Sequence, residues 1–161
     1  MIDCDYDTNC GTSDRTGNCA CDGGDPGSAL NFIVSTNGVP TRSAYPYTGS
    51  KGNCVMTNSR TQVHTGKKWI SANSPSALKG AVYDRPVVVA LQSDKSVFEF
   101  YSSGILDSSA CGTSLNHGVT VVGWGYDSGK DYFKIKNSWG TSWGESGYAR
   151  LNNDGVEGSA G

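Results

Sequence analysis

Six cysteines constrain this chain more than any other feature, because five of them fall within its first 54 residues. Disulfides persist outside the reducing cytosol, so this density favours a disulfide-bonded protein of an oxidising compartment. A zinc site is the alternative interpretation, but Cys19-Ala20-Cys21 lacks the spacing of zinc-binding CxxC pairs. The sequence therefore predicts disulfides and no metal or other cofactor, while the cysteines alone leave their pairing open.

The charge and hydropathy of the chain indicate that it binds neither nucleic acid nor a membrane. The formal net charge of −2, with lysines and arginines scattered along the chain, gives no electrostatic footprint for nucleic acid. The longest wholly apolar run, residues 87–91, is far too short to span a bilayer. We therefore expect neither nucleic acid nor a membrane as a partner.

The order of helical and strand patterns predicts an α+β fold. Residues 1–25 are polar and have no period, which indicates a loop fixed by disulfides. Asp25-Pro26 and Ser74-Pro75 each supply an N-cap and a proline at the first helical position, and an apolar stripe follows each of them. Four later runs rich in β-branched and aromatic residues predict strands at 87–91, 119–126, 132–136 and 148–151. Helices early and strands late are typical of α+β proteins.

His117 stands at the start of the predicted strand 119–126. A lone histidine at such a position is more often structural than catalytic. Asn137 follows another predicted strand and precedes Trp139 and Trp143, which are separated by small and polar residues. This segment is either a glycine-rich turn anchored by two tryptophans or an asparagine held beside an imidazole under an indole ring.

Two segments, Asn116-His117-Gly118-Val119 and Lys136-Asn137-Ser138-Trp139-Gly140-Thr141-Ser142-Trp143-Gly144, resemble the papain-like cysteine proteases, including the cathepsins. The resemblance continues in residues 21–24, 44–47 and 100–105, and it covers nearly the whole chain in the family's order. It implies a papain-like fold of two lobes around a cleft. Residues from about 1 to 50 would be a remnant of the helical lobe, and residues from about 51 to 161 would form the barrel lobe that bears the histidine and asparagine.

The same resemblance implies roles for individual residues. His117 is expected to be the catalytic histidine, Asn137 the residue that orients it, and Trp139 the shield that keeps water from their hydrogen bond. Gly23 and Gly24 are expected to run along the backbone of a bound peptide, where a missing Cβ permits close approach. The other expected substrate contacts, which include an apolar pocket and a wall on the leaving side, are Pro26, Ala90, Leu115, Asn116, Gly118 and Trp143.

These residue types suit a cysteine–histidine mechanism. A thiolate is the nucleophile, and a neighbouring imidazolium lowers the pKa of the thiol and later returns its proton to the leaving amine. A neutral asparagine orients the ring without adding a second buried anion, as a variant of the Ser-His-Asp triad. The nucleophile's own family motif, Cys-Gly-[Ser/Ala]-Cys-[Trp/Tyr], does not occur in this sequence.

The resemblance also implies how the cysteines pair. Cys4 should bond to Cys54, and Cys10 should bond to Cys19 within an insertion of residues 9–20. Cys21 and Cys111 should remain free thiols, because the family's partner for each is missing from the sequence. Ala160 stands where the partner of Cys111 would be.

We interpret the chain as a papain-like cysteine endopeptidase that lacks the nucleophile-bearing segment and the family's last strand, and we expect it to be inactive alone. Its expected partners are a peptide or protein substrate and a propeptide or cystatin-like inhibitor, in a lysosome or vacuole or outside the cell. Two alternatives remain open. One is a naturally truncated pseudoenzyme that binds peptides or proteins, and the other is an unrelated disulfide-rich secreted interaction domain.

Overall fold

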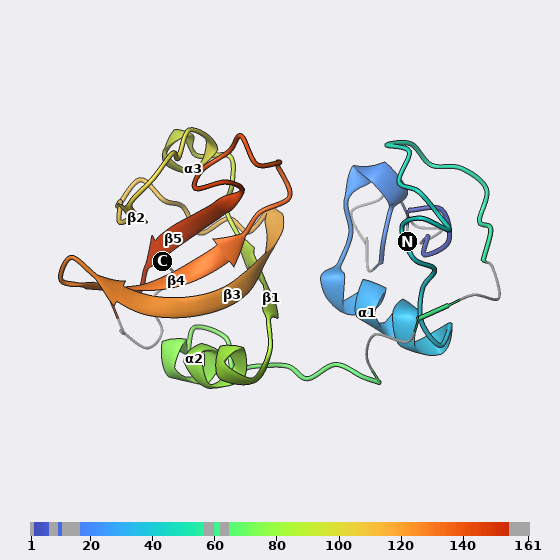
Figure 1. Cartoon of the computed structure of the whole chain (residues 1–161), viewed down its shortest axis with the longest axis horizontal. Helices are drawn as coiled ribbons and strands as arrows, with labels where there is room; N and C mark the ends of the chain where they lie inside the picture. Colours follow the sequence, from blue (N-terminus) through green and yellow to red (C-terminus); the bar gives the residue numbers. More distant parts are fainter. Residues whose placement is uncertain (1, 7–9, 11–16, 57–59, 62–64, 155–161) are drawn as a thin grey trace. The chain divides into compact units, whose positions relative to one another are not determined.

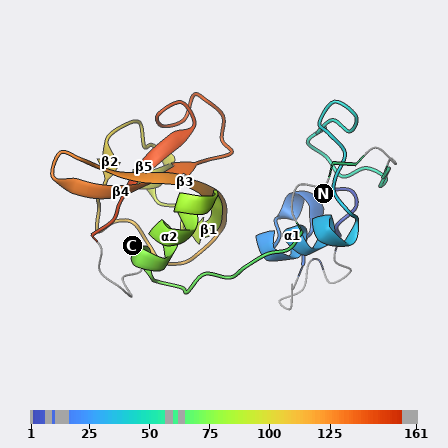
Figure 2. The ribbon, with the colours of Figure 1, turned by 60° about the horizontal axis from the view of Figure 1, so that its bottom comes forward.

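A computed structural model describes residues 2–6, 10, 17–56, 60–61 and 65–154. The chain divides into two compact units, Met1–Trp69 and Ile70–Gly161 (Figures 1 and 2). Met1, much of the expected insertion at 9–20 and the C-terminal residues with Ala160 lie outside the described residues.

The first unit contains one α-helix, α1 (Pro26–Ser35), which follows a short 3-10 helix, η1 (Ala20–Asp22). The Asp25 carboxylate accepts a hydrogen bond from the Ser28 N–H at 2.5 Å, so Asp25 is the N-cap that the sequence predicts. Past the end of the helix, the N–H of Gly38 donates to the Ile33 carbonyl at 2.8 Å, and Gly38 has a φ of 105°. Glycine commonly ends helices in this left-handed conformation, and the predicted helix is confirmed.

Two disulfide bonds cross-link the first unit. The structure contains both pairs that the resemblance implies, Cys4–Cys54 and Cys10–Cys19. The remaining two cysteines, Cys21 and Cys111, carry free thiols, as expected. Both cross-links lie within the first unit, whereas Cys111 belongs to the second.

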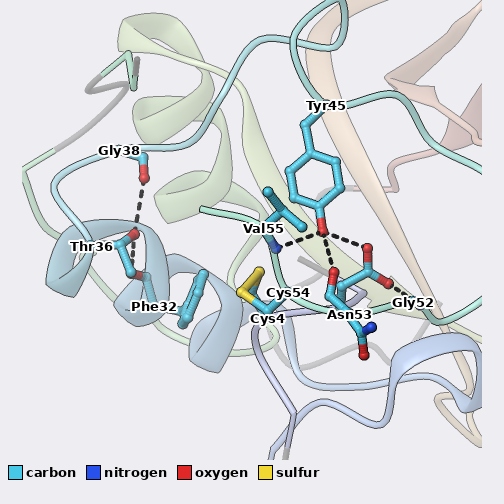
Figure 3. Close-up of a disulfide and its surroundings, with 10 residues drawn as sticks. Cys4, Phe32, Thr36, Gly38, Tyr45, Gly52, Asn53, Cys54 and Val55 are labelled. Carbon is cyan, nitrogen blue, oxygen red and sulfur yellow. Dashed lines mark hydrogen bonds between the residues drawn. A yellow bond between two sulfur atoms is a disulfide. The ribbon is translucent and has the colours of Figure 1, made fainter. Parts of the chain in front are cut away.

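A hydrogen-bonded cluster centred on Tyr45 lies beside the Cys4–Cys54 disulfide (Figure 3). The Asp3 carboxylate accepts from the Gly52 N–H at 2.5 Å and from the Tyr45 hydroxyl at 2.7 Å. These two donors hold the pKa of Asp3 below its usual value, with the Gly52 N–H the larger cause. The pKa of Tyr45 is raised, because its hydroxyl donates to Asp3. The cluster therefore joins the chain before Cys4 to two segments much later in the unit.

The second unit is built on a five-stranded sheet with the strand order β1-β3-β4-β5-β2. Its strands are β1 (Val87–Leu91), β2 (Ile105–Leu106), β3 (His117–Asp127), β4 (Lys130–Lys136) and β5 (Tyr148–Asn152). Only the β2–β5 pair is parallel within this described sheet. The predicted second helix is α2 (Pro75–Asp84), which is capped by Ser74 and packs against the sheet near β3 (Figures 1 and 2).

Strands β3 and β4 form a hairpin closed by Ser128 and Gly129, whose φ angles of 52° and 84° are both positive. Two positive φ angles at the centre of a two-residue turn match the right-handed twist of the flanking strands. On β4, Phe133 and Ile135 are buried and the lysines between and after them are exposed. This alternation is typical of an antiparallel strand that is buried on one side.

The core of the second unit joins the sheet to α2 and to a one-turn helix, α3 (Ser96–Glu99). Its buried members are Val82, Phe98, Tyr101, Val119, Val121, Phe133, Ile135, Trp143 and Ala149. Neither α3 nor β2 is predicted by the sequence patterns, because each is too short to show a period. The predicted α+β class is confirmed by the helices and the five-stranded sheet.

Two further findings concern the described residues as a set. No helix among them has the length and apolar character needed to cross a bilayer. No group of three or more His, Cys, Asp or Glu side chains gathers where it could hold a metal ion.

Candidate active site

The sheet brings His117 and Asn137 together. His117 is the first residue of β3, and Asn137 directly follows β4. Since the two strands are antiparallel neighbours, the start of one and the end of the other meet at the same end of the hairpin. There, His117 Nε2 lies 2.8 Å from Asn137 Oδ1, which is a hydrogen bond.

The hydrogen bonds of Asn137 define which ring nitrogen carries a proton. Asn137 Oδ1 also accepts from the backbone N–H of Ser138 at 2.8 Å, so this atom is the amide oxygen. An amide oxygen only accepts, and His117 Nε2 must therefore be the protonated nitrogen. The other nitrogen, Nδ1, is then the one with a lone pair that can accept a proton.

Burial fixes the Asn137 side chain. Asn137 is only 7% exposed, and its Nδ2 is buried without a hydrogen-bond partner in the described part of the chain. Burial and the two hydrogen bonds of Oδ1 together hold the amide in one orientation.

Aromatic rings surround the imidazole. The Trp139 ring lies 5.2 Å from the His117 ring, centroid to centroid, with an interplanar angle of 33°. Phe98 of α3 approaches His117 edge-on at 6.5 Å and also packs against Trp139 and Trp143. Trp143 is anchored in turn, because its Nε1 donates to the carbonyls of Phe98 and Glu99, each at 3.2 Å. The sequence patterns single out the two tryptophans but miss Phe98.

Several expected substrate contacts lie near the start of β3. Ala90 and Gly118 are paired across β1 and β3, and both are exposed. Leu115 is 66% exposed. The Asn116 side chain is engaged within the unit, because its Oδ1 accepts from the Ser93 N–H at 2.8 Å. These four residues lie around the β3 end that bears the imidazole, and their contact with a substrate stays a prediction.

The other expected substrate contacts have different surroundings. Trp143 is only 9% exposed and belongs to the core, so most of its ring contacts protein. Gly23, Gly24 and Pro26 lie in the first unit, the two glycines just before α1 and the proline at its first position. Their part in a site with His117 stays a prediction.

No cysteine among the described residues has the features expected of the nucleophile. Four of the six are bonded in disulfides. Burial raises the pKa of the Cys111 thiol above its usual value, which lowers its thiolate fraction at neutral pH. Cys21 is exposed and belongs to the first unit.

Comparison with known proteins agrees with this geometry. The family model described as papain family cysteine protease matches residues 1–159. The chain is 42% identical over 158 residues to cysteine endopeptidase Rep1 of Oryza sativa subsp. japonica, covering 96% of this chain and 40% of that protein. The chain thus spans well under half the length of this relative.

Solved structures show the same fold. Bromelain protease from Ananas comosus, in complex with an inhibitor, matches with a TM-score of 0.80 and 41% identity, over 89% of this chain and 66% of that one. The proform of the ragweed pollen cysteine protease Amb a 11 matches with a TM-score of 0.83 and 31% identity, over 97% of this chain and 46% of that one. The fold is therefore papain-like, as the sequence predicts, and the chain belongs to the papain family of cysteine proteases.

Proposed function

We propose that this chain is the histidine- and asparagine-bearing part of a papain-like cysteine endopeptidase. In this proposal the first 50 or so residues belong to the helical lobe, and those from about 51 onward to the barrel lobe. The observation that carries it is the 2.8 Å hydrogen bond from His117 Nε2 to Asn137 Oδ1, which leaves Nδ1 as the nitrogen for proton transfer. Membership of the papain family supports the same reaction class.

The proposed reaction is hydrolysis of a peptide bond through an acyl-enzyme. His117 Nδ1 takes the proton of the nucleophilic thiol, and the imidazolium stabilises the thiolate. The thiolate sulfur attacks the scissile carbonyl carbon, and the Nδ1 proton passes to the leaving amine as the C–N bond breaks. The neutral imidazole then takes a proton from a water, whose oxygen attacks the thioester carbon. The C–S bond breaks, which releases the carboxylic acid product and restores the thiolate beside the imidazolium. Throughout these steps, the Nε2–H of His117 remains hydrogen-bonded to Asn137 Oδ1, which keeps the ring in one orientation.

Trp139 is proposed to shield this hydrogen bond. Its ring lies 5.2 Å from the imidazole, centroid to centroid, and the residue is only 39% exposed. Shielding from water strengthens a hydrogen bond between polar groups, because the local dielectric constant falls.

The nucleophile is proposed to come from residues outside these 161. The family's Cys-Gly-[Ser/Ala]-Cys-[Trp/Tyr] motif does not occur in the sequence, and four of its six cysteines are cross-linked. The polypeptide alone is then inactive, because it supplies a base and an orienting residue but no activated thiolate.

The whole protein is proposed to act on extended peptides or proteins and to be controlled by a propeptide or a cystatin-like inhibitor. The ragweed relative was solved as a proform, which supports control by a propeptide, and bromelain was solved with the inhibitor E64, which supports a site that an inhibitor can occupy. Gly23, Gly24, Pro26 and the exposed residues around the start of β3 would contact the peptide. The two disulfides support a lysosomal, vacuolar or extracellular location, because such bonds persist in oxidising compartments.

A chimera tests the proposal. A segment from an active relative that carries the Cys-Gly-Ser-Cys-Trp motif is joined in the family's order to this chain, and cleavage of an extended peptide with a hydrophobic second residue is measured. We expect the chain alone to be inactive and the chimera to be active and blocked by a thiol-directed epoxide. His117→Ala should abolish the activity, whereas His64→Ala, which replaces the other histidine of the sequence, should not.

The alternative function is a binding module without catalysis. The sequence feature that favours it is the absent nucleophile motif. A chimera that folds but remains inactive, together with a chain that binds extended peptides on its own, would support this alternative. An epoxide-sensitive activity of the unmodified chain would contradict both the proposal and the alternative.

A further inference from the structure

The loop between β4 and β5, residues 137–147, bears both Asn137 and Trp139. Backbone hydrogen bonds close it on itself: the Asn137 N–H donates to the Gly147 carbonyl at 2.9 Å, and the Gly147 N–H donates to the Trp143 carbonyl at 2.7 Å. Ser146 has a φ of 57°, a left-handed conformation that is unfavourable for a non-glycine residue and persists only where the surroundings impose it. The shape of this loop therefore depends on what anchors it from outside.

Glu145 is such an anchor. One oxygen of its carboxylate accepts from the Gly104 N–H at 2.9 Å and from Arg150 Nη2 at 2.7 Å, and the other accepts from Arg150 Nε at 3.0 Å. The two side chains are only 25% and 22% exposed, and the two-pronged geometry is the strong form of an arginine–carboxylate pair. Arg150, with help from the Gly104 N–H, holds the pKa of Glu145 below its usual value, so the anchor stays charged at mildly acidic pH.

The same anchor reaches the aromatic cluster at the imidazole. The backbone N–H of Arg150 donates to the Tyr101 hydroxyl at 3.3 Å, and the Tyr101 ring packs against Trp143 at 5.6 Å. Trp143 lies 5.5 Å from Trp139, which lies 5.2 Å from His117. A continuous series of contacts through Tyr101, Trp143 and Trp139 thus connects the ion pair to the imidazole.

We propose that Glu145 is a positioning residue: by binding Arg150 and Gly104 it holds the 137–147 loop so that Trp139 covers His117. Glu145 acts through the loop and not on a reacting atom. The inference deepens the proposed function, since the orientation of the acid–base pair matters most if the pair is catalytic. The position of Trp139 over His117 is, however, a property of the resting chain, and it can be measured without any activity.

Indole emission reports how far Trp139 is covered. Quenching of indole emission by acrylamide rises with the exposure of the ring to solvent. The difference in quenching between a protein and the same protein with Trp139→Phe is the contribution of Trp139. In the unmodified chain this contribution should be that of a partly shielded ring, since Trp139 is 39% exposed and lies 5.2 Å from the His117 ring.

The decisive comparison is between Glu145→Ala and Asp127→Ala. Both variants remove one carboxylate partner of Arg150, since Asp127 also binds its guanidinium, at 2.7 Å. Only Glu145 lies in the 137–147 loop. In Glu145→Ala the contribution of Trp139 should become markedly more accessible to acrylamide, whereas in Asp127→Ala it should match the unmodified chain, with both proteins folded by far-ultraviolet circular dichroism. If Glu145→Ala does not fold, Glu145→Gln serves in its place, with a smaller rise in accessibility expected.

Three outcomes overturn the inference: an unchanged accessibility of Trp139 in Glu145→Ala, an equal rise in the two variants, or a fully accessible Trp139 in the unmodified chain. The chimera separates this result from the proposed function. If the chimera is inactive but Glu145→Ala alone uncovers Trp139, the endopeptidase proposal is refuted and the positioning role stands. If the chimera is active but Trp139 stays covered in Glu145→Ala, the positioning role is refuted and the endopeptidase proposal stands.

Discussion

The Cys4–Cys54 disulfide is expected to decide whether the first unit folds. Its cysteines lie 50 residues apart in sequence, against 9 for Cys10–Cys19. Among the described residues, every buried hydrophobic side chain except Cys19 belongs to the second unit. A unit with so little apolar burial relies on cross-links for its stability.

The contribution of the Cys4–Cys54 bond to the free energy of unfolding follows from the length of the loop that the bond closes. If chain entropy dominates, a cross-link across about 50 residues contributes about 4 kcal/mol, and one across about 10 residues contributes about 3 kcal/mol. Domains have roughly 0.05–0.15 kcal/mol of stability per residue, which is about 3–10 kcal/mol for a unit of this size. Replacing Cys4 and Cys54 with alanine therefore removes much or all of the stability of the first unit. A unit that still folds should melt roughly 15–30 °C lower.

Amide hydrogen exchange read by mass spectrometry, with thermal unfolding beside it, checks this prediction. In Cys4→Ala/Cys54→Ala, amides of α1 should exchange rapidly while those of β3 and β4 keep their protection. The matched control is Cys21→Ala/Cys111→Ala, which removes the two free thiols and no cross-link, and it should match the unmodified chain. Equal protection of α1 with and without the Cys4–Cys54 bond would refute the reasoning, because it would mean that packing alone stabilises the unit.

Three other predictions follow from the contacts described above. Asn137→Ala removes the acceptor of the imidazole Nε2–H, a bond worth about 1.5–3 kcal/mol when the ring is charged, so kcat/KM of the active chimera should fall roughly 10- to 100-fold. Phe98 is 3% exposed, so Phe98→Ala should lower the free energy of unfolding by about 3–5 kcal/mol and Phe98→Leu should lower it much less. Urea unfolding of the two variants measures both values. The pKa of Asp3 is lowered in the folded state by Gly52 and Tyr45, so the stability it contributes is present above its unfolded pKa and lost as pH falls through the folded one. Asp3→Asn should flatten this acid limb in melts at stepwise lower pH, and an unchanged limb would contradict the role of the cluster.

The elements with local signals could be predicted from the sequence. Asp25 and Ser74 cap α1 and α2 where the Asp-Pro and Ser-Pro pairs indicate, because a cap is a contact between close neighbours. The strands appear where β-branched and aromatic residues cluster, with ends shifted by one or two residues. By contrast, α3 has no side-chain cap, and β2 exists only through its pairing with β5. Such elements depend on tertiary contacts that no local pattern records.

The residues of the candidate site also fall into those that the sequence predicts and those that depend on tertiary contacts. His117, Asn137 and the two tryptophans could be singled out because they stand in motifs that resemble those of a family. Phe98 and Glu145 could not, since their neighbours are set by how α3 and the 137–147 loop fold against the sheet. The protonated nitrogen of His117 is likewise a property of structure, because it depends on which atom of the Asn137 amide faces the ring.

The β3–β4 hairpin, with its tight Ser128-Gly129 turn, has a consequence for how this protein is made. His117 and Asn137 are 20 residues apart, and the turn between their strands closes a short loop, so the entropy lost in bringing them together is small. A contact between residues so close in sequence loses little loop-closure entropy, so it can form before contacts between distant segments do. The hydrogen-bonded His117–Asn137 pair can therefore form independently of the segment that we propose brings the nucleophile. If the proposed function holds, a protease divided upstream of this hairpin would act as a split enzyme, inactive in its parts and active once they associate.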